Sequence, residues 1–123
     1  GGEHPLRASC RRYLEEAAAG ELELHVSVEA LQELLFHRMR RGDRSDAVAL
    51  VRDVRELCHA HPVDDAVVAR MLELVATTRL GGRDAVHAAT ALGAGFGEIT
   101  TPDSDFDGVP GLERRGPGEG TQL

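Results

Sequence analysis

The sequence has few cysteines, no long apolar run and fewer basic than acidic residues, and each shortage excludes a class of protein. Cys10 and Cys58 are isolated and lack zinc-type spacing, so reduced core thiols are expected rather than a disulfide or a metal site. No apolar run approaches a membrane span or a secretory segment, so a soluble, cytoplasmic chain that avoids the membrane is expected. The net charge of −7 argues against a protein that coats nucleic acid by charge alone.

The composition is that of one globular domain. The 123 residues are 41% hydrophobic and 28% charged, enough to bury a single core. Apolar residues at helical spacing alternate with short stretches of strand period, which predicts an α/β fold with a parallel sheet in three layers, α/β/α. Helices are expected over 5–19; from about Val28 to Gly42, with Ser27 as the N-cap; after Asp43 or Ser45, with an apolar stripe that ends at Cys58; after Asp64 or Asp65; and over 83–93. Strands are expected over 21–28, 59–63, 97–101 and 111–115. We expect one domain over residues 1–115 and a disordered tail over 116–123.

The stretch "TTPDSDFDG" (100–108) places carboxylates at Asp103, Asp105 and Asp107. An EF-hand needs a bidentate glutamate at loop position 12, where this chain has Arg114, so a calcium loop is disfavoured. A polar turn, in which Asp103 and Asp105 bind nearby backbone amides, is the simplest interpretation of the stretch alone. Its place just past a predicted strand favours a functional site, because sites of parallel sheets form at the carboxyl ends of strands.

Three other clusters allow two interpretations each. Asp84 opens an alanine-rich helix and is suited to the helix dipole there, with His87 one turn further along. His59 and His61 follow Cys58, but so short a segment is a poor zinc site. The basic run near a helix end is either a solvated face or a set of phosphate contacts: Arg38, Arg40, Arg41 and Arg44.

Taken together, "RDAVHAATALGAG" (83–95) and "EITTPDSDFDGVPGL" (98–112) resemble the C-terminal half of PIN domains, above all VapC-type toxins of bacterial toxin–antitoxin pairs. The family pattern of Arg-Asp-Ala-x-His-Ala-Ala, then Thr-x-Asp, then Asp-Phe is matched in order. Upstream, "VSVEALQELL" (26–35) is similar to the family's second motif, whose acid falls on Glu33. Helical spacing by itself would leave Glu33 on the solvated side of its helix.

The resemblance implies a PIN-like fold and a ribonuclease that hydrolyses RNA phosphodiester bonds with Mg²⁺ or Mn²⁺. It assigns Asp84 and Asp103 to metal binding, Glu33 to a further ligand or to water orientation, and Asp105 to a supporting catalytic role. Converging carboxylates repel one another and a hard divalent ion relieves this, which suits the assignment. His87 is expected to be structural. The implied partners are an RNA substrate and a cognate antitoxin protein, and a homodimer is compatible with them.

One part of the family pattern is missing. The family begins with a central strand that carries its first catalytic Asp, whereas this sequence opens at Gly1, in the loop that follows. We therefore expect the parent protein to extend upstream by about a strand's length or more. Two rival interpretations stay open: a PIN-like module that binds RNA or protein without cleaving it, and a calcium-binding or structural α/β module.

Overall fold

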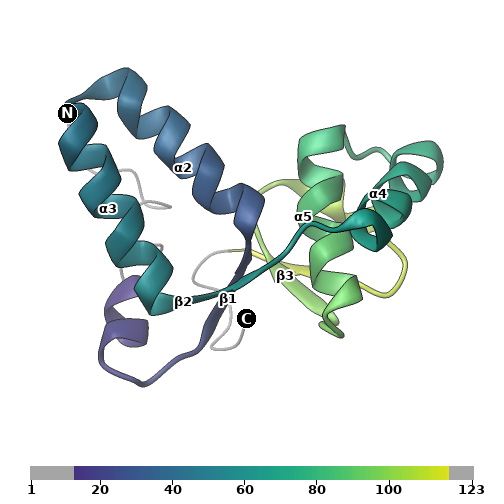
Figure 1. Ribbon diagram of the computed structural model, residues 1–123. Coiled ribbons are helices and arrows are strands. Elements are labelled where there is room, and N and C mark those ends of the chain that lie inside the picture. Colours follow the sequence, from purple (N-terminus) through teal and green to yellow (C-terminus); the bar gives the residue numbers. More distant parts are fainter. Residues whose placement is uncertain (1–12, 117–123) are drawn as a thin grey trace.

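The computed structural model describes residues 13–116 (Figure 1). Residues 13–18 are helical. The elements that follow are β1 (Leu24–Ser27), α2 (Val28–Arg41), α3 (Arg44–Leu57), β2 (Cys58–His61), α4 (Asp65–Thr77), α5 (Gly82–Gly93), β3 (Glu98–Thr100), the 3₁₀ turn η1 (Ser104–Gly108) and β4 (Glu113–Arg115). The predicted order of helices and strands is confirmed over this range. Residues 1–12 and 117–123, with Cys10, most of the first predicted helix and nearly all of the predicted tail, lie outside it.

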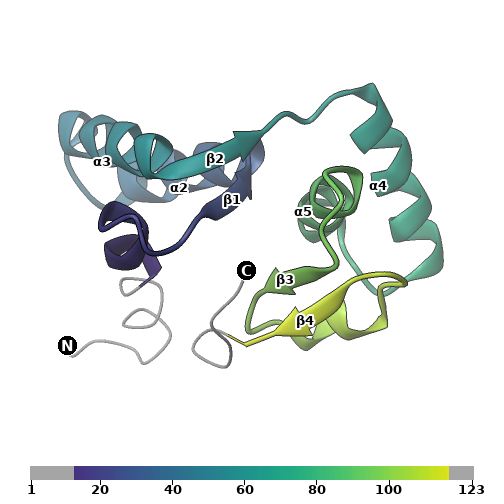
Figure 2. The same cartoon turned by 90° about the horizontal axis from the view of Figure 1, so that it is seen from below.

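The four strands form two separate parallel pairs. Strand β1 pairs with β2, with Leu24 opposite Cys58, and β3 pairs with β4, with Ile99 opposite Arg114. Helices α2 and α3 lie beside the first pair, α5 lies beside the second, and α4 packs against α5 (Figure 2). The predicted short parallel sheet is therefore present in two halves, which are not hydrogen-bonded to each other. Helix α5 contacts both halves, through β1 and through β3.

Polar side chains cap α2, α3 and α4 at positions that the sequence predicted. The Ser27 hydroxyl accepts a hydrogen bond from the Ala30 N–H at 3.2 Å, which caps α2, and Asp64 caps α4 in the same way. Asp43, rather than Ser45, caps α3. Cys58 was expected on the apolar stripe of α3 but is the first residue of β2, because its backbone is already extended (ψ 155°) at the end of the helix.

The main core lies between α4, α5 and the segment that follows β3. Ala85, Ala88 and Ala89 of α5 are completely buried, which lets the axis of α5 approach α4 closely, as the alanine-rich face predicts. The cluster consists of Leu74, Leu80, Ala85, Ala88, Ala89, Phe106, Val109 and Leu112. This core holds the start of α5 and the end of β3 against each other, and the acidic residues of interest lie at those two places.

No helix within residues 13–116 is both long and apolar enough to cross a membrane.

Candidate active site

Two carboxylates predicted from sequence meet where α5 begins and β3 ends. Asp84 lies in the first turn of α5, and Asp103 follows β3 as the N-cap of η1. Burial raises the pKa of Asp84 above its ordinary value, and the Asp103 charge raises it further. A side-chain hydrogen bond to Asp103 and the Glu33 charge act in the same direction, while His87 opposes them. The Asp84 carboxyl is therefore partly desolvated and faces a second acid.

Glu33 reaches this region from α2 and is held by α5. Its Oε1 lies 3.3 Å from Nε2 of His87 and 3.8 Å from Nε of Arg83, and its side chain is only 25% exposed. Helical spacing alone predicted that Glu33 is solvated. That prediction is wrong because α5 covers this side of α2. The resemblance placed it near Asp84, which agrees with the geometry.

His87 connects three elements of the fold. Its Nδ1 lies 2.9 Å from the Ser27 hydroxyl at the end of β1, and its Nε2 faces Glu33 on α2. The ring is half-buried and belongs to α5. Sequence reasoning assigned Ser27 only a capping role, because nothing in its spacing indicates that α5 lies against it. Only the motif "RDAVH" singles out Arg83, the other partner of Glu33.

The loop after β3 is an ordered turn. An Oδ1 of Asp103 accepts from the Asp105 N–H at 2.9 Å, and the Asp103 N–H donates to the Thr101 hydroxyl at 3.2 Å. Asp107 forms a 2.6 Å ion pair with Arg114, the residue that displaces the EF-hand glutamate. The Asp105 side chain is exposed, so this residue contributes its backbone N–H to the turn. The polar-turn interpretation therefore holds for the Asp103 side chain, whose Oδ1 binds a backbone amide and whose Oδ2 is left for other partners.

The pair Asp84 and Asp103 has the chemistry of a divalent-cation site. Carboxylate oxygens are hard ligands, and a cation between them would relieve the repulsion that raises the Asp84 pKa. Within residues 13–116, no group of three His, Cys, Asp or Glu side chains is arranged to hold a metal ion together. Mg²⁺ is commonly held by one or two carboxylates and keeps several waters, so this pair fits such an ion.

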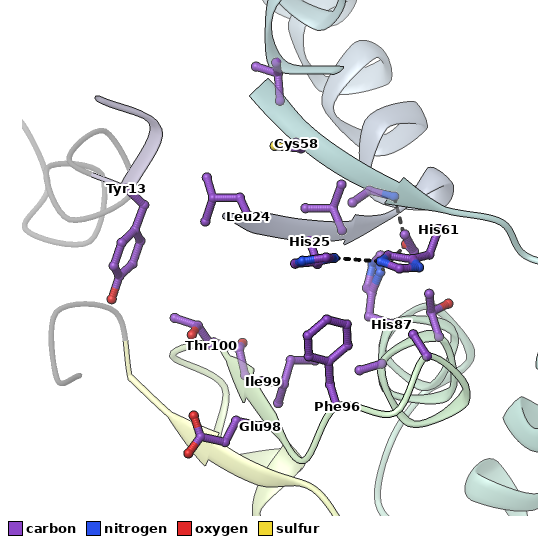
Figure 3. Close-up of a pocket in the computed structure, with 18 of the residues that line it drawn as sticks. Tyr13, Leu24, His25, Cys58, His61, His87, Phe96, Glu98, Ile99 and Thr100 are labelled. Carbon is purple, nitrogen blue, oxygen red and sulfur yellow. Dashed lines mark hydrogen bonds between the residues drawn. The ribbon is translucent and has the colours of Figure 1, made fainter. Parts of the chain in front are cut away.

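A large cavity lies beside the carboxylates rather than around them. It has a volume of about 460 Å³ and is bordered by β1, α5 and β3, with His25, His61, His87 and Phe96 along one side (Figure 3). A smaller cavity of about 180 Å³ lies at Glu33, between Arg83 and the exposed Phe36. The predicted basic run is exposed, and Arg40 lies over the Phe36 ring, 5.5 Å from its centre.

Two curated relatives are similar to this chain in sequence. The chain is 38% identical over 109 residues to ribonuclease VapC7 of Mycobacterium tuberculosis, which covers 86% of this chain and 75% of that protein. It is 36% identical over 104 residues to ribonuclease VapC23 of the same organism, covering 84% and 82%.

Solved structures share the fold. One is a toxin–antitoxin complex from Klebsiella pneumoniae, with a TM-score of 0.66 and 20% identity over 86% of this chain and 82% of that one. The other is VapBC2 from Rickettsia felis bound to a promoter DNA fragment, with a TM-score of 0.69 and 16% identity over 89% and 85%. Residues 2–112 match the PIN domain family. The chain therefore belongs to the PIN domain family.

Proposed function

We propose that this chain is a metal-dependent endoribonuclease and the toxin component of a toxin–antitoxin pair. Membership of the PIN family and the two VapC ribonucleases among its relatives support the activity. The observation that carries the proposal is the meeting of Asp84 with Asp103, close to Glu33, at the carboxyl end of β3. This is the edge at which α/β proteins place their sites.

In this proposal, Asp84 and Asp103 bind Mg²⁺ or Mn²⁺, directly or through water. A bound ion of this kind lowers the pKa of a coordinated water and stabilises the charge that develops on a phosphate. Glu33 orients water or adds a ligand, and the backbone of Asp105 fixes the Asp103 carboxylate through its 2.9 Å hydrogen bond. The substrate is an RNA phosphodiester.

His87 acts as a positioning residue. The Ser27 hydroxyl holds one ring nitrogen, so the other is aimed at Glu33 and fixes the position of its carboxylate. Arg83 balances part of the negative charge of Glu33, and its exposed side chain is suited to contact a phosphate. The exposed arginines in the last turn of α2 could extend that contact along the RNA backbone.

The antitoxin partner is proposed to cover the small cavity at Glu33. Exposed Phe36 offers an apolar contact there, and the nearby carboxylates attract a basic side chain. The two solved toxin–antitoxin complexes of the same fold support a partner of this class. A homodimer is compatible with this arrangement.

The test compares Asp84→Asn with Asp65→Asn in a Mg²⁺-dependent RNA cleavage assay. Both aspartates lie in the first turn of a helix, but Asp65 is exposed on α4 and is not among the groups that shift the pKa of Asp84. Asparagine keeps the shape of the side chain and removes the charge that attracts the cation. We expect Asp84→Asn to lower the cleavage rate by roughly a hundredfold or more and Asp65→Asn to leave it unchanged.

Two results would count against the proposal. If Asp84→Asn cuts RNA at the wild-type rate, the carboxylate pair is not the metal site. If the unmodified chain binds RNA in Mg²⁺ and in Mn²⁺ without cutting it, the non-catalytic PIN-like module is the better description.

A further inference from the structure

The segment that carries Asp103 is bridged by one side chain of the neighbouring strand. Arg114 of β4 donates from Nε to Oδ1 of Asp107 at 2.6 Å and from Nη1 to the Thr101 carbonyl at 3.4 Å. Thr101 directly follows β3 and Asp107 lies in η1, so the two acceptors flank Asp103 along the chain. The guanidinium therefore ties the start of the segment 101–107 to its end.

Strand pairing directs Arg114 toward this segment. Its neighbour Arg115 pairs with Glu98 on β3 at 3.1 Å and with Glu113 at 3.8 Å, so these three side chains share one face of the β3–β4 pair. Successive side chains of a strand point to opposite faces, which places Arg114 on the other face. There it meets η1, which contacts β4. Two arginines that are adjacent in the sequence therefore have different surroundings.

The bridge acts on Asp103 through short links. The Asp103 N–H donates to the Thr101 hydroxyl at 3.2 Å, so a displacement of Thr101 moves the Asp103 backbone. Further along, Phe106 is 3% exposed and anchors η1 in the main core, one residue before Asp107. Between these two fixed points, Asp103 forms a side-chain hydrogen bond with Asp84. The position of the Asp103 carboxylate therefore depends on how firmly both ends of the segment are held.

Arg114 is better placed to control local geometry than to bind RNA or to stabilise the whole fold. Its side chain is 24% exposed and two of its nitrogens already donate within the chain, whereas the Arg83 side chain is 71% exposed. The Asp107 side chain is 57% exposed, and water screens such ion pairs, so their contribution to overall stability is small. Mg²⁺ accepts little deviation from octahedral coordination, so the direction of a carboxylate ligand affects its binding.

We propose that Arg114 is a positioning residue of the active site. Its guanidinium bridges Thr101 and Asp107 and so directs the Asp103 carboxylate toward Asp84. The inference rests on the proposed metal-dependent function and deepens it, because it assigns a role to a residue outside the carboxylate set. Nothing in the sequence indicates this role, since the bridge depends on the β3–β4 register and on the fold of the segment. Arginine suits it because one planar group offers several N–H donors in fixed directions.

The test measures Mn²⁺ binding by calorimetry and, in EDTA, hydrogen exchange at the Asp105 amide, which donates to Asp103 Oδ1. Arg114→Ala should raise the Mn²⁺ dissociation constant roughly tenfold and speed exchange at that amide. Arg115→Ala is the matched control, because it removes the same charge from β4 and leaves the bridge in place; it should not weaken Mn²⁺ binding or change the exchange. Charge alone predicts the opposite sign for both variants, since removing a cation near carboxylates strengthens the binding of another cation.

A second pair of variants decides the question if Arg114→Ala does not fold. Asp107→Ala removes one acceptor of the bridge, and Glu113→Ala removes an equal charge whose partner is Arg115. Asp107→Ala should weaken Mn²⁺ binding more than Glu113→Ala does, and it alone should speed exchange at the Asp105 amide. Arg114→Lys keeps the charge but offers a single ammonium group, so it should restore Mn²⁺ binding only in part.

Three results would overturn the inference: Arg114→Ala matching Arg115→Ala in both measurements, Asp107→Ala matching Glu113→Ala, or full Mn²⁺ binding in Arg114→Lys. The proposed function would still stand in each case if Asp84→Asn binds Mn²⁺ more weakly than wild type. If wild type and Asp84→Asn bind Mn²⁺ equally, the metal site itself is wrong and the inference fails with it.

Discussion

At the scale of single residues, Asp84 is the most informative side chain because its environment works against its charge. Burial and the neighbouring Asp103 both raise its pKa above the ordinary value of 3.8. At pH values between 3.8 and the raised pKa, the folded chain therefore binds more protons at Asp84 than the unfolded chain does. Without metal, the free energy of unfolding falls as pH rises through this window, and the whole of that loss remains at neutral pH.

The corresponding prediction concerns Asp84→Asn in EDTA. The variant lacks the ionised group, so it should melt at an equal or higher temperature than wild type near pH 7, and the difference should shrink toward pH 4. Adding Mg²⁺ should raise the melting temperature of wild type and leave Asp84→Asn unchanged. A plain helix-dipole role predicts the opposite sign, with a loss of roughly 0.3–1 kcal/mol in the variant.

At the scale of elements, the junction of β1 with α2 depends on Ser27. Its hydroxyl caps α2 through the Ala30 N–H and also contacts His87 on α5, and the residue is only 5% exposed. One side chain therefore joins a strand end, a helix start and the neighbouring helix. Loss of a helix cap alone costs about 1 kcal/mol, and a partly buried ring nitrogen of His87 left without its partner adds to that.

Ser27→Ala should lower the free energy of unfolding by about 1–3 kcal/mol in urea denaturation. Ser45→Ala is the matched control, because Ser45 is exposed at the start of α3 and its hydroxyl only donates to Asp43. The control should change stability by less than about 0.5 kcal/mol. Equal effects of the two substitutions would mean that the contact between Ser27 and His87 adds nothing.

The strand pair β1–β2 carries a cluster of three histidines. Nδ1 of His25 lies 2.8 Å from Nε2 of His61, and the His25 ring stacks on His59 at 4.7 Å. Burial lowers the pKa of His25 below its ordinary value of 6.5, and the charges of His59 and His61 lower it further, against Glu23. The folded chain therefore binds fewer protons here than the unfolded chain.

Stability should accordingly be lost as pH falls below about 6.5, and His25→Gln should remove part of that loss. His37→Gln is the control, since His37 is exposed on α2. The measurement is the urea midpoint at roughly pH 7.5 and pH 5.5 for the three proteins. If His25→Gln loses as much stability on acidification as the control does, the cluster is not responsible.

At the scale of the whole molecule, net charge and exposed surface bear on the proposed antitoxin. The chain has 21 acidic and 14 basic residues, so its field attracts a basic partner. Exposed Phe36, beside Glu33, supplies an apolar contact within that field. Charge would then govern the association rate, and the apolar contact would govern how long the complex lasts.

A basic, Phe36-covering antitoxin segment should bind at micromolar concentration or better and inhibit RNA cleavage. Phe36→Ala should weaken binding by roughly 1–2 kcal/mol. Leu72→Ala is the control and should have little effect, because Leu72 is an exposed apolar residue of α4, away from the proposed contact. Calorimetry at low and high salt separates the charge contribution. If the antitoxin proteins encoded beside the gene for this chain do not bind it, the partner assignment fails. The nuclease assignment is then decided by its own test.

Most of the local structure follows from short-range signals in the sequence. Hydrophobic period, caps at Ser27 and Asp64, and the glycine at Gly42 predicted elements that the structure contains, because these signals act over a few neighbouring residues. The motif around Asp84 and Asp103 indicated the family. The division into a domain over 1–115 and a tail over 116–123 stays a prediction.

Contacts between residues that lie far apart in the sequence follow only from the tertiary structure. Glu33 and His87 are 54 positions apart, and no local period indicates that α5 covers that side of α2. The clustering of His25, His59 and His61 depends on the β1–β2 register, in which His25 lies opposite His59. A one-residue slip would move the side chains of one strand to the other face of the sheet and separate the histidines. The separation of the sheet into two halves is likewise a property of packing, because strand pairing depends on edges brought together from distant parts of the chain.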